Sequence, residues 1–276
     1  DEGIKNWTLC LLAELQRHHQ VQALTSFGED MPELGVSNVR TNKLLCGSRL
    51  AKRVRQFGPQ CLLYVPTAAA TVASFWRARR LHALAGGAPV ALVALQVRAY
   101  GAFAARIMPL LAPERVAVQS ERTRRSLQAL GPAMAGRLVD MPPAIDLSRF
   151  GPAGEARRRA LRQAWGVAPD AWVWLHVGHL NRGRGLGALP QLRRRPQDLV
   201  LVAASRSTPH DAELLARLRG EGVRVITDPV ARIEELYQLA DGYVFPVQGA
   251  TSAIDLPLSV LEAMACDLPV LSTPFG

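Results

Sequence analysis

Short, continuous apolar runs alternate with amphipathic segments along most of the chain. The runs are bounded by turn residues and lack polar alternation, so they indicate strands that are buried on both faces. Buried strands that alternate with helices are typical of a parallel sheet wound with helices on both sides. The sequence therefore predicts a doubly wound α/β fold, with strands in 21–25, 61–67, 89–96, 171–180, 199–205, 223–227 and 269–273, and within 115–131 and 231–247.

Helices are expected between these strands, where apolar residues fall at helical spacing. In the helix within 115–131, Ser120 is expected to be the cap, because a serine side chain accepts hydrogen bonds from the free amides of a helix start. The other predicted helices lie in the opening segment through Leu15, in 45–58, 68–85, 155–167 and 210–220, and within 231–247.

The segment 252–276 combines a helix, a turn and a strand around one carboxylate. Pro257 suits the first turn of the helix, and Asp255 just before it can cap the free amides. Asp267 can adopt the left-handed conformation that ends a helix. Glu262 shares its helix face with small side chains, which leaves its carboxylate open to a ligand. The alternative is a solvent-facing glutamate on a packed helix.

The start of this helix suits a nucleoside diphosphate. A helix N-terminus presents unpaired N–H groups and a partial positive charge, so Leu258 and Ser259 could hold a diphosphate. A carboxylate one turn further along, at Glu262, can accept hydrogen bonds from two vicinal ribose hydroxyls, as in dinucleotide-binding folds.

A glycine-rich turn follows the predicted strand 171–180. Gly178 and the glycines after it permit a tight connection and the close approach of a phosphate, although such a turn alone is a weak signal. Arg184 carries a permanent charge and can bind phosphate with two parallel hydrogen bonds. His179 is a second candidate, whose charge depends on pH.

The stretch PLSVLEAMACDLPVLSTPFG, residues 257–276, closely resembles the donor-site segment of retaining GT-B glycosyltransferases of glycosyltransferase family 4. In that family the helix carries the second glutamate of an E-x7-E motif, which binds the donor ribose, and Glu262 matches it. The first glutamate normally contacts the donor sugar hydroxyls, and Ile254 stands at its position. Either Asp255 substitutes for that glutamate or the sugar is held differently.

A second motif supports the same resemblance. VGHLNRGRGL, residues 177–186, is similar to the family's VGRLvpeKGl, whose arginine and lysine bind the donor diphosphate. The resemblance assigns these roles to His179 and Arg184, beside Gly178. Gln96 stands where the family often has a histidine near the reacting sugar. A glutamine can hydrogen-bond a hydroxyl but cannot act as a base, and the alternative is a polar residue that ends a strand.

The resemblance covers nearly the whole chain, weakly in the first half and strongly from about Val139 onward. Residues 139–152 resemble the family segment that leads into the second domain, so we expect a boundary at about residue 150. Gly3 resembles the end of the family's first glycine-rich loop, and Val230 lies where members contact the nucleobase, so the resemblance makes both candidates for donor binding. We interpret the chain as an internal fragment that lacks the family's first strand and its C-terminal helices.

The resemblance implies two Rossmann-like domains that face each other across a cleft, with residues 1–150 on the acceptor side and 151–276 binding the donor. It implies transfer of a sugar from a nucleoside diphosphate sugar to an acceptor hydroxyl of a glycan, lipid or small molecule, with retained anomeric configuration. No metal and no cofactor apart from the donor substrate are expected. Arg184, His179 and the helix start at Leu258 would stabilise the departing diphosphate.

Three alternatives stay open at this point. The residues at 254 and 96 favour a catalytically silent relative that binds a sugar nucleotide or a protein. A GT-B epimerase or phosphorylase is opposed by the family-like segment at 257–265. A nucleic-acid-binding protein is supported by charge alone.

Composition bears on the partners and the location. The net charge of +10 suits nucleic acid, an anionic membrane or acidic substrates. Basic residues are dispersed in short runs such as 157–159 without a nucleic-acid-binding signature, so nucleic acid is not expected and peripheral membrane attachment is a second interpretation. No apolar run reaches the roughly 20 residues that cross a bilayer. The scattered cysteines indicate buried thiols, and the expected location is cytoplasmic or peripheral at the inner face of the membrane.

Overall fold

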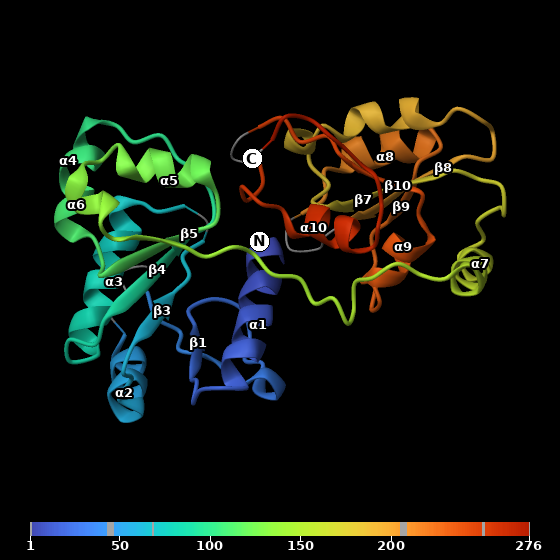
Figure 1. Cartoon of the computed structure of the whole chain (residues 1–276). Helices are drawn as coiled ribbons and strands as arrows, with labels where there is room; N and C mark the ends of the chain where they lie inside the picture. The colour runs from blue at the N-terminus through green and yellow to red at the C-terminus, as the bar shows by residue number, and fades with distance from the viewer. Residues whose placement is uncertain (1, 43–46, 68, 205–208, 250–251, 276) are drawn as a thin grey trace. The chain divides into compact units, whose positions relative to one another are not determined.

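The computed structural model describes residues 2–42, 47–67, 69–204, 209–249 and 252–275 (Figure 1). The chain divides into two compact units, one formed by Ile4–Pro142 and the other by Pro143–Gly276 together with Asp1–Gly3. Residues 143–150, which the sequence assigns to the first domain, group with the second unit. Phe150 provides the physical reason, because its ring packs edge-on against Tyr237 with 5.8 Å between the ring centroids.

The first unit contains two parallel sheets. One pairs β1 (Ala23–Thr25) with β2 (Val36–Asn38), and the other has the strand order β3-β4-β5-β6. Buried residues of the second sheet, such as Leu92 and Val116, share one core with residues of the surrounding helices. The other elements are α1 (Glu2–Gln16), α2 (Ser48–Phe57), β3 (Leu62–Tyr64), α3 (Val72–Leu84), β4 (Val90–Ala94), α4 (Ala102–Leu111), β5 (Arg115–Val118), α5 (Glu121–Gln128), α6 (Pro132–Ala135) and β6 (Leu138–Asp140).

The second unit is built on one parallel sheet with the strand order β11-β10-β7-β8-β9. The chain enters at the centre, adds two strands on one side, then returns and adds two on the other. The order therefore reverses between β7 and β10. Its elements are α7 (Glu155–Ala164), β7 (Val173–Gly178), β8 (Leu199–Ala204), α8 (Ala212–Gly220), β9 (Arg224–Ile226), α9 (Glu234–Leu239), β10 (Gly242–Phe245), α10 (Leu258–Ala265) and β11 (Val270–Ser272), with 3-10 helices η2 (Arg182–Arg184) and η3 (Leu186–Leu192).

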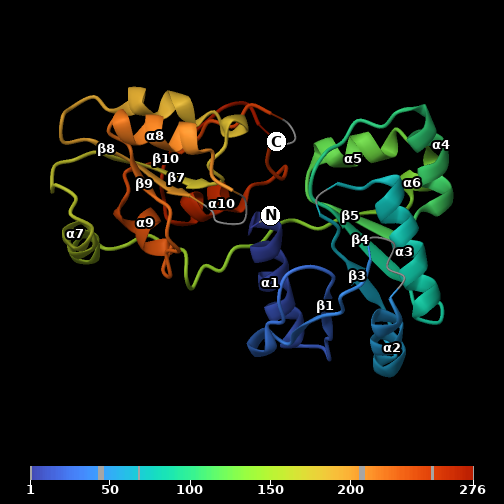
Figure 2. The same cartoon turned by 180° about the vertical axis from the view of Figure 1, so that it is seen from behind.

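Both faces of this sheet are buried, as the continuous apolar runs predict. On β8, Leu201 and Ala203 point into a core shared with α9 and α10. Their neighbours Val200 and Val202 point into a separate core shared with α8 and η3. Figure 2 shows α8 and α9 on opposite sides of this sheet. This alternation of one strand between two cores confirms the doubly wound α/β class, because successive side chains of a strand point to opposite faces.

The helix caps show where local sequence signals were sufficient. The Ser120 hydroxyl accepts a hydrogen bond from the Thr123 amide at 3.0 Å, which confirms the predicted cap of α5. The backbone of Asp267 is left-handed, with φ of 61°, as predicted for the end of α10. α10 begins after Pro257, which stands at the cap position and makes no side-chain hydrogen bond there. The capping role predicted for Asp255 stays a prediction.

Two further expectations are wrong. Gly3 lies in the first turn of α1 and is therefore helical, not the end of a glycine-rich loop. Cys10 and Cys61 are exposed, whereas Cys266 is buried. Apolar neighbours along the chain do not bury a thiol, because every element that packs on one side turns another side to solvent. Some predictions lie outside the described residues. They are the element ends at Leu45, Ala68 and Ser205 and the buried thiol of Cys46.

Asp241 has a structural role, as its position before β10 suggested. Its carboxylate accepts a hydrogen bond from the Val173 amide at 2.7 Å and forms ion pairs with Arg158 and Arg162. These contacts join the starts of β7 and β10 to α7.

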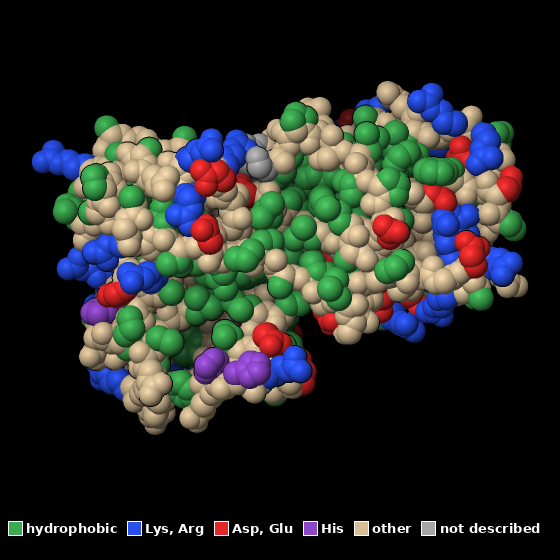
Figure 3. All heavy atoms as spheres, in the orientation of Figure 1, with side chains coloured by type: hydrophobic (Ala, Val, Ile, Leu, Met, Phe, Trp, Pro, Cys, Tyr) green, Lys and Arg blue, Asp and Glu red, His purple; other side chains and the backbone are tan. Residues whose placement is uncertain are grey.

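Basic residues are dispersed over the face shown in Figure 3 and do not gather into one stripe. Within the run 157–159, Arg157 pairs with Glu235 at 2.6 Å and Arg158 pairs with Asp241, so much of this charge is used inside the unit. Among the helices of the described residues, none combines the length and the apolar character that crossing a membrane requires.

Candidate functional site

The candidate site lies in the second unit, where the chain leaves β7 and β10 at their carboxyl ends. In open α/β sheets, ligands bind beyond the carboxyl ends of the strands where the strand order reverses. Here the reversal falls between β7 and β10. The residues that follow β7 form η2, which carries Arg184, and the segment after β10 leads to α10. The fold thus brings both predicted motifs to one edge of one sheet.

Gly178 ends β7 and allows two basic side chains to approach the backbone. A Cβ atom at this position would lie 3.2 Å from Nε2 of His176 and 3.4 Å from Nη1 of Arg184. The first distance is tighter than ordinary van der Waals contact, and the second lies at its lower limit. Gly178 therefore leaves room for the imidazole and the guanidinium beside the strand end.

Gly185 makes the closest approach in this turn. Its backbone is left-handed, with φ of 68°, and an added Cβ atom would lie 2.2 Å from the carbonyl oxygen of Pro246. Residue 246 follows β10 directly. The glycine therefore lets η2 pack against the end of β10, which fixes the backbone next to Arg184.

Arg184 is a buried cation with an unsatisfied donor. Only 7% of the residue is exposed, and its Nε has no hydrogen-bond partner among the residues that the structure describes. Burial lowers the pKa of the guanidinium from its ordinary value, and the nearby Tyr243 opposes this shift. Buried charges are costly unless paired, so this arrangement suits an anionic ligand that would complete the pairing.

Glu262 lies on α10 and is held by a neighbouring helix. Its Oε2 atom accepts a hydrogen bond from the hydroxyl of Tyr237 at 2.7 Å. Burial raises the pKa of the Glu262 carboxyl, while the Tyr237 hydrogen bond and the Arg149 charge act in the opposite direction. The carboxylate is partly buried and retains acceptor capacity, because each carboxylate oxygen can accept more than one hydrogen bond.

Tyr243 links the two halves of the site. It lies on β10, and its hydroxyl donates to the carbonyl oxygen of Val177 on β7 at 3.2 Å. A side-chain hydrogen bond with Ser259 and the charge of Arg184 lower the pKa of the phenol, although burial raises it more strongly. Arg184 from η2 and Ser259 from α10 therefore lie around one phenol oxygen.

The other candidate residues have separate positions. His179 is buried directly after β7, and its charge contributes to the low pKa of His176. Asp255 is only 2% exposed, and Ile254, at the position of the family's first glutamate, is 7% exposed. Leu258 is buried at the start of α10. Val230 is partly buried against the core shared with α9 and α10.

Gln96 belongs to the first unit, where it forms a parallel bridge with Ala69 just beyond β4. Its predicted role near the reacting sugar stays a prediction.

Sequence reasoning missed three buried polar residues of this site: His176, Tyr237 and Tyr243. All three stand within predicted strands or helices, and no candidate chemistry was assigned to them. The one available signal was polarity in an otherwise apolar run, such as the histidine in VWLHVG. Among the described residues, no group of three or more His, Cys, Asp or Glu side chains is placed to hold a metal ion.

His176 is fully buried in the neutral form. Its Nδ1 lies 2.9 Å from the carbonyl oxygen of Val244, and its Nε2 has no hydrogen-bond partner among the described residues. Burial lowers the pKa of His176 to about 4, and the charges of Arg184 and His179 add to this. Since Nδ1 faces a carbonyl acceptor, the proton of the neutral ring belongs on Nδ1.

This low pKa predicts a specific pH dependence of stability. Between pH 6.5 and 4 the unfolded state binds a proton at His176 that the folded state does not, so the free energy of unfolding falls as pH falls. We expect this group alone to contribute a loss of about 2 kcal/mol between pH 7 and pH 5. Urea unfolding at several pH values, with His176→Phe as the variant, measures it. If the free energy of unfolding changed equally with pH in the wild type and in His176→Phe, the prediction would be wrong.

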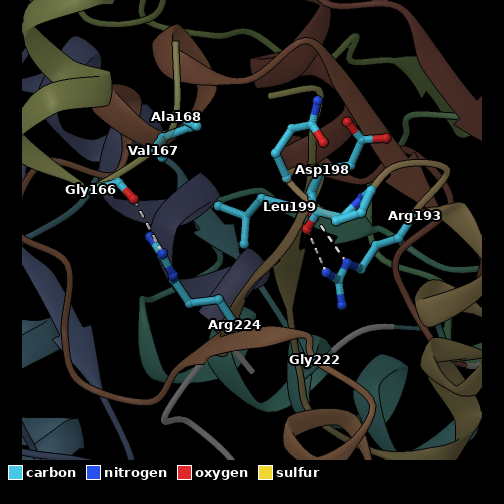
Figure 4. A pocket seen from close by; sticks show the side chains of 10 residues that line it. Gly166, Val167, Ala168, Arg193, Asp198, Leu199, Gly222 and Arg224 are labelled. Atoms are coloured by element: carbon cyan, nitrogen blue, oxygen red, sulfur yellow. Dashed lines mark hydrogen bonds between the residues drawn. The ribbon is translucent and has the colours of Figure 1, made fainter. Parts of the chain in front are cut away.

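A separate pocket of about 200 Å³ lies at the opposite edge of the sheet, beside the amino ends of β8 and β9 (Figure 4). Its arginines are engaged with backbone carbonyls. Arg224 donates to the carbonyl oxygens of Trp165 at 2.7 Å and Gly166 at 3.4 Å, and Arg193 donates to that of Asp198 at 3.1 Å. The pocket shares no residue with the site around Arg184.

Residues 174–276 match the family model described as Glycosyl transferases group 1. The matched range begins in β7 and contains the residues from His176 to Glu262 that form the site.

Curated relatives match a similar part of the chain. The D-inositol 3-phosphate glycosyltransferase of Kineococcus radiotolerans is 32% identical over 182 residues, which cover 60% of this chain and 40% of the relative. The GDP-mannose-dependent alpha-(1-6)-phosphatidylinositol monomannoside mannosyltransferase of Mycolicibacterium smegmatis is 32% identical over 165 residues, which cover 55% of this chain and 42% of the relative. The matches thus span about two fifths of the length of these relatives.

Solved structures resemble almost the whole chain. Anabaena Alr3699/HepE, in complex with UDP and glucose, has a TM-score of 0.75 and 17% identity, covering 98% of this chain and 77% of that one. WaaG, a glycosyltransferase involved in lipopolysaccharide biosynthesis, has a TM-score of 0.65 and 17% identity, covering 99% of this chain and 78% of that one. At such identities the likeness shows the fold alone.

Proposed function

We propose that this chain, which is similar to glycosyltransferases in sequence and to GT-B glycosyltransferases in fold, transfers a sugar from a nucleoside diphosphate sugar to an acceptor hydroxyl with retained anomeric configuration. The observation that carries this proposal is the buried guanidinium of Arg184 beside Gly178, at the carboxyl edge where the strand order reverses. A buried, incompletely bonded cation at this edge suits a diphosphate.

In the proposed reaction the diphosphate is the leaving group. Negative charge develops on its oxygens as the bond to the sugar breaks, and a preorganised cation stabilises that charge. Arg184 supplies this cation without a metal ion, His179 adds a second basic group, and the first amides of α10 supply a partial positive charge. Glu262 accepts hydrogen bonds from the ribose hydroxyls and so orients the nucleotide.

The relatives and the solved structures guide the choice of donors. HepE was solved with UDP and UDP-glucose, and the mannosyltransferase relative is described as GDP-mannose-dependent. Donors with both bases therefore belong in a first screen. The acceptor is proposed only as a hydroxyl of a glycan, lipid or small molecule, and the location as cytoplasmic or peripheral at the inner face of the membrane.

A catalytically silent binding protein is the second candidate. The observation that favours it is the apolar, buried Ile254 at the position where the family has its first glutamate. Its neighbour Asp255 is also buried. A measurement of turnover decides whether the Asp255 carboxylate replaces that glutamate. A silent relative would bind the donor but release no nucleoside diphosphate from it.

The proposal predicts that Glu262→Ala weakens donor binding about 10-fold or more, because the ribose hydroxyls lose a charged acceptor. Calorimetric titration of the full chain with UDP- and GDP-sugars measures the affinity, and Met264→Ala, an exposed position on the same helix, is the control. Release of nucleoside diphosphate in the presence of candidate acceptors then separates a transferase from a silent relative. If the folded wild-type chain binds no donor, the proposed function is wrong.

A further inference from the structure

Four buried rings form a continuous column behind the candidate site: Phe150, Tyr237, Tyr243 and His176. Tyr237 and Tyr243 stack with 5.8 Å between ring centroids and an interplanar angle of 30°. His176 stacks on Tyr243 at 6.3 Å and 19°, and Phe150 packs edge-on against Tyr237. We call this set the aromatic column. It contains residues of β7, β10 and α9, so it joins three elements of the second unit.

The polar groups of the column point to the site residues. The hydroxyl of Tyr237 donates to Glu262, and Tyr243 interacts with Ser259, one turn earlier on α10. Both polar side chains on this part of α10 are thus contacted by phenols from other elements. Burial raises the pKa of both phenols well above its ordinary value, so each hydroxyl keeps its proton and can donate.

The helix itself does not fix the Glu262 side chain. α10 has only eight residues, and the Glu262 side chain that it carries has several rotatable bonds. The Tyr237 ring, in contrast, has little freedom, because it stacks on Tyr243 and makes an edge-on contact with Phe150. The Tyr237 hydroxyl is therefore the contact that orders the carboxylate before any ligand binds.

We infer that Tyr237 is a positioning residue for the nucleotide ribose, because it holds Oε2 of Glu262 and leaves the rest of the carboxylate to accept from the ribose hydroxyls. This inference rests on the proposed function, which assigns the ribose to Glu262. Tyr243 supports the same arrangement by stacking on Tyr237 and contacting Ser259.

The test compares a ribonucleotide with its analogue that lacks both ribose hydroxyls. Wild-type chain, Tyr237→Phe, Glu262→Ala and the double variant are titrated with UDP and 2′,3′-dideoxy-UDP, or with the GDP pair if the wild type prefers guanine. Tyr100→Phe is the matched control, because it removes a phenol that donates to a backbone carbonyl, that of Ala70 at 3.0 Å, in the other unit.

We expect Tyr237→Phe to weaken UDP binding about 5- to 10-fold and to leave dideoxy-UDP binding unchanged, as the loss of one ordering hydrogen bond predicts. In the Glu262→Ala background the same change should have no further effect, which is the signature of a residue that acts through another. Tyr100→Phe should leave both affinities unchanged. An equal loss for both ligands in Tyr237→Phe would identify a merely structural role and overturn the inference.

A ligand-free measurement separates this inference from the proposed function. The hydrogen bond from Tyr237 lowers the pKa of Glu262, so Tyr237→Phe should raise that pKa further in a carboxylate NMR titration. An unchanged pKa would overturn the positioning contact even if donors bind. A raised pKa in a chain that binds neither UDP nor GDP would leave the contact real but refute the ribose role and the proposed function together.

Discussion

Replacement of Arg184 by methionine is expected to weaken binding of a nucleoside diphosphate about 100-fold or more. The reason is the loss of a buried, charge-assisted contact, which typically costs several kcal/mol when one partner is truncated. Methionine keeps an apolar stem of similar length, so the packing beside Gly178 is largely retained. Calorimetric titration with the donor selected by the wild-type chain measures the effect.

The same substitution should not destabilise the chain. In the absence of ligand, Arg184 is a buried charge whose Nε lacks a partner among the described residues, so its removal relieves a cost. We expect the urea midpoint of Arg184→Met to equal or exceed that of the wild type. A binding loss that came with a large drop in stability would point to damaged packing, not to a lost ligand contact.

Arg182→Met is the matched control. Arg182 lies on the same 3-10 turn, but its side chain is exposed and pairs with Asp211 and Glu213. Exposed ion pairs contribute little to stability, so this variant should bind the donor within about 2-fold of the wild type by the same measure. Equal losses at residues 182 and 184 would indicate a general effect of positive charge and would refute a specific role for Arg184.

The second large effect is expected at Gly185. Alanine there needs a left-handed backbone with a Cβ atom 2.2 Å from the carbonyl oxygen of Pro246. The backbone strain costs about 1–2 kcal/mol, and the clash with a backbone atom forces the turn away from β10 at a further cost of about 1–3 kcal/mol. We therefore expect Gly185→Ala to lower the free energy of unfolding by about 3 kcal/mol or more, measured by urea denaturation.

Gly166→Ala separates the clash from the strain. Gly166 is also left-handed, with φ of 60°, but an added Cβ atom there meets no other atom within 4 Å. Its alanine variant should lose only the strain energy of about 1–2 kcal/mol. Similar losses at the two glycines would show that η2 does not need its close approach to β10. Donor binding should also fall in Gly185→Ala alone, because Arg184 precedes it.

Burial of Glu262 makes the free energy of unfolding depend on pH. A folded-state pKa above the ordinary value means that the folded chain holds this proton more tightly than the unfolded chain does. Stability from this group is therefore present at low pH and is lost as pH rises through the raised pKa. Ionisation of this buried carboxyl thus costs stability, which is common for functional residues.

Local pattern alone was enough to predict most of the strands and helices and the two motifs, although β2, β6, α4 and α6 were not predicted. Continuous apolar strands require burial on both faces, and this requirement, without any contact information, led to the doubly wound sheet that the two cores on either side of β8 confirm. The roles suggested for Arg184 and Glu262 came from resemblance to a family. Ser120 and Asp267 were predictable because a cap depends on residues within one turn.

Only the tertiary structure decided what surrounds those motifs. Tyr237 and Glu262 are 25 residues apart, and His176 and Val244 are 68 apart, so no local pattern could pair them. The exposure of Cys10 and the grouping of residues 143–150 with the second unit depend likewise on packing between distant segments. The sequence determines which side chains can bind a phosphate or a ribose; the fold determines which of them are buried, ordered and brought together.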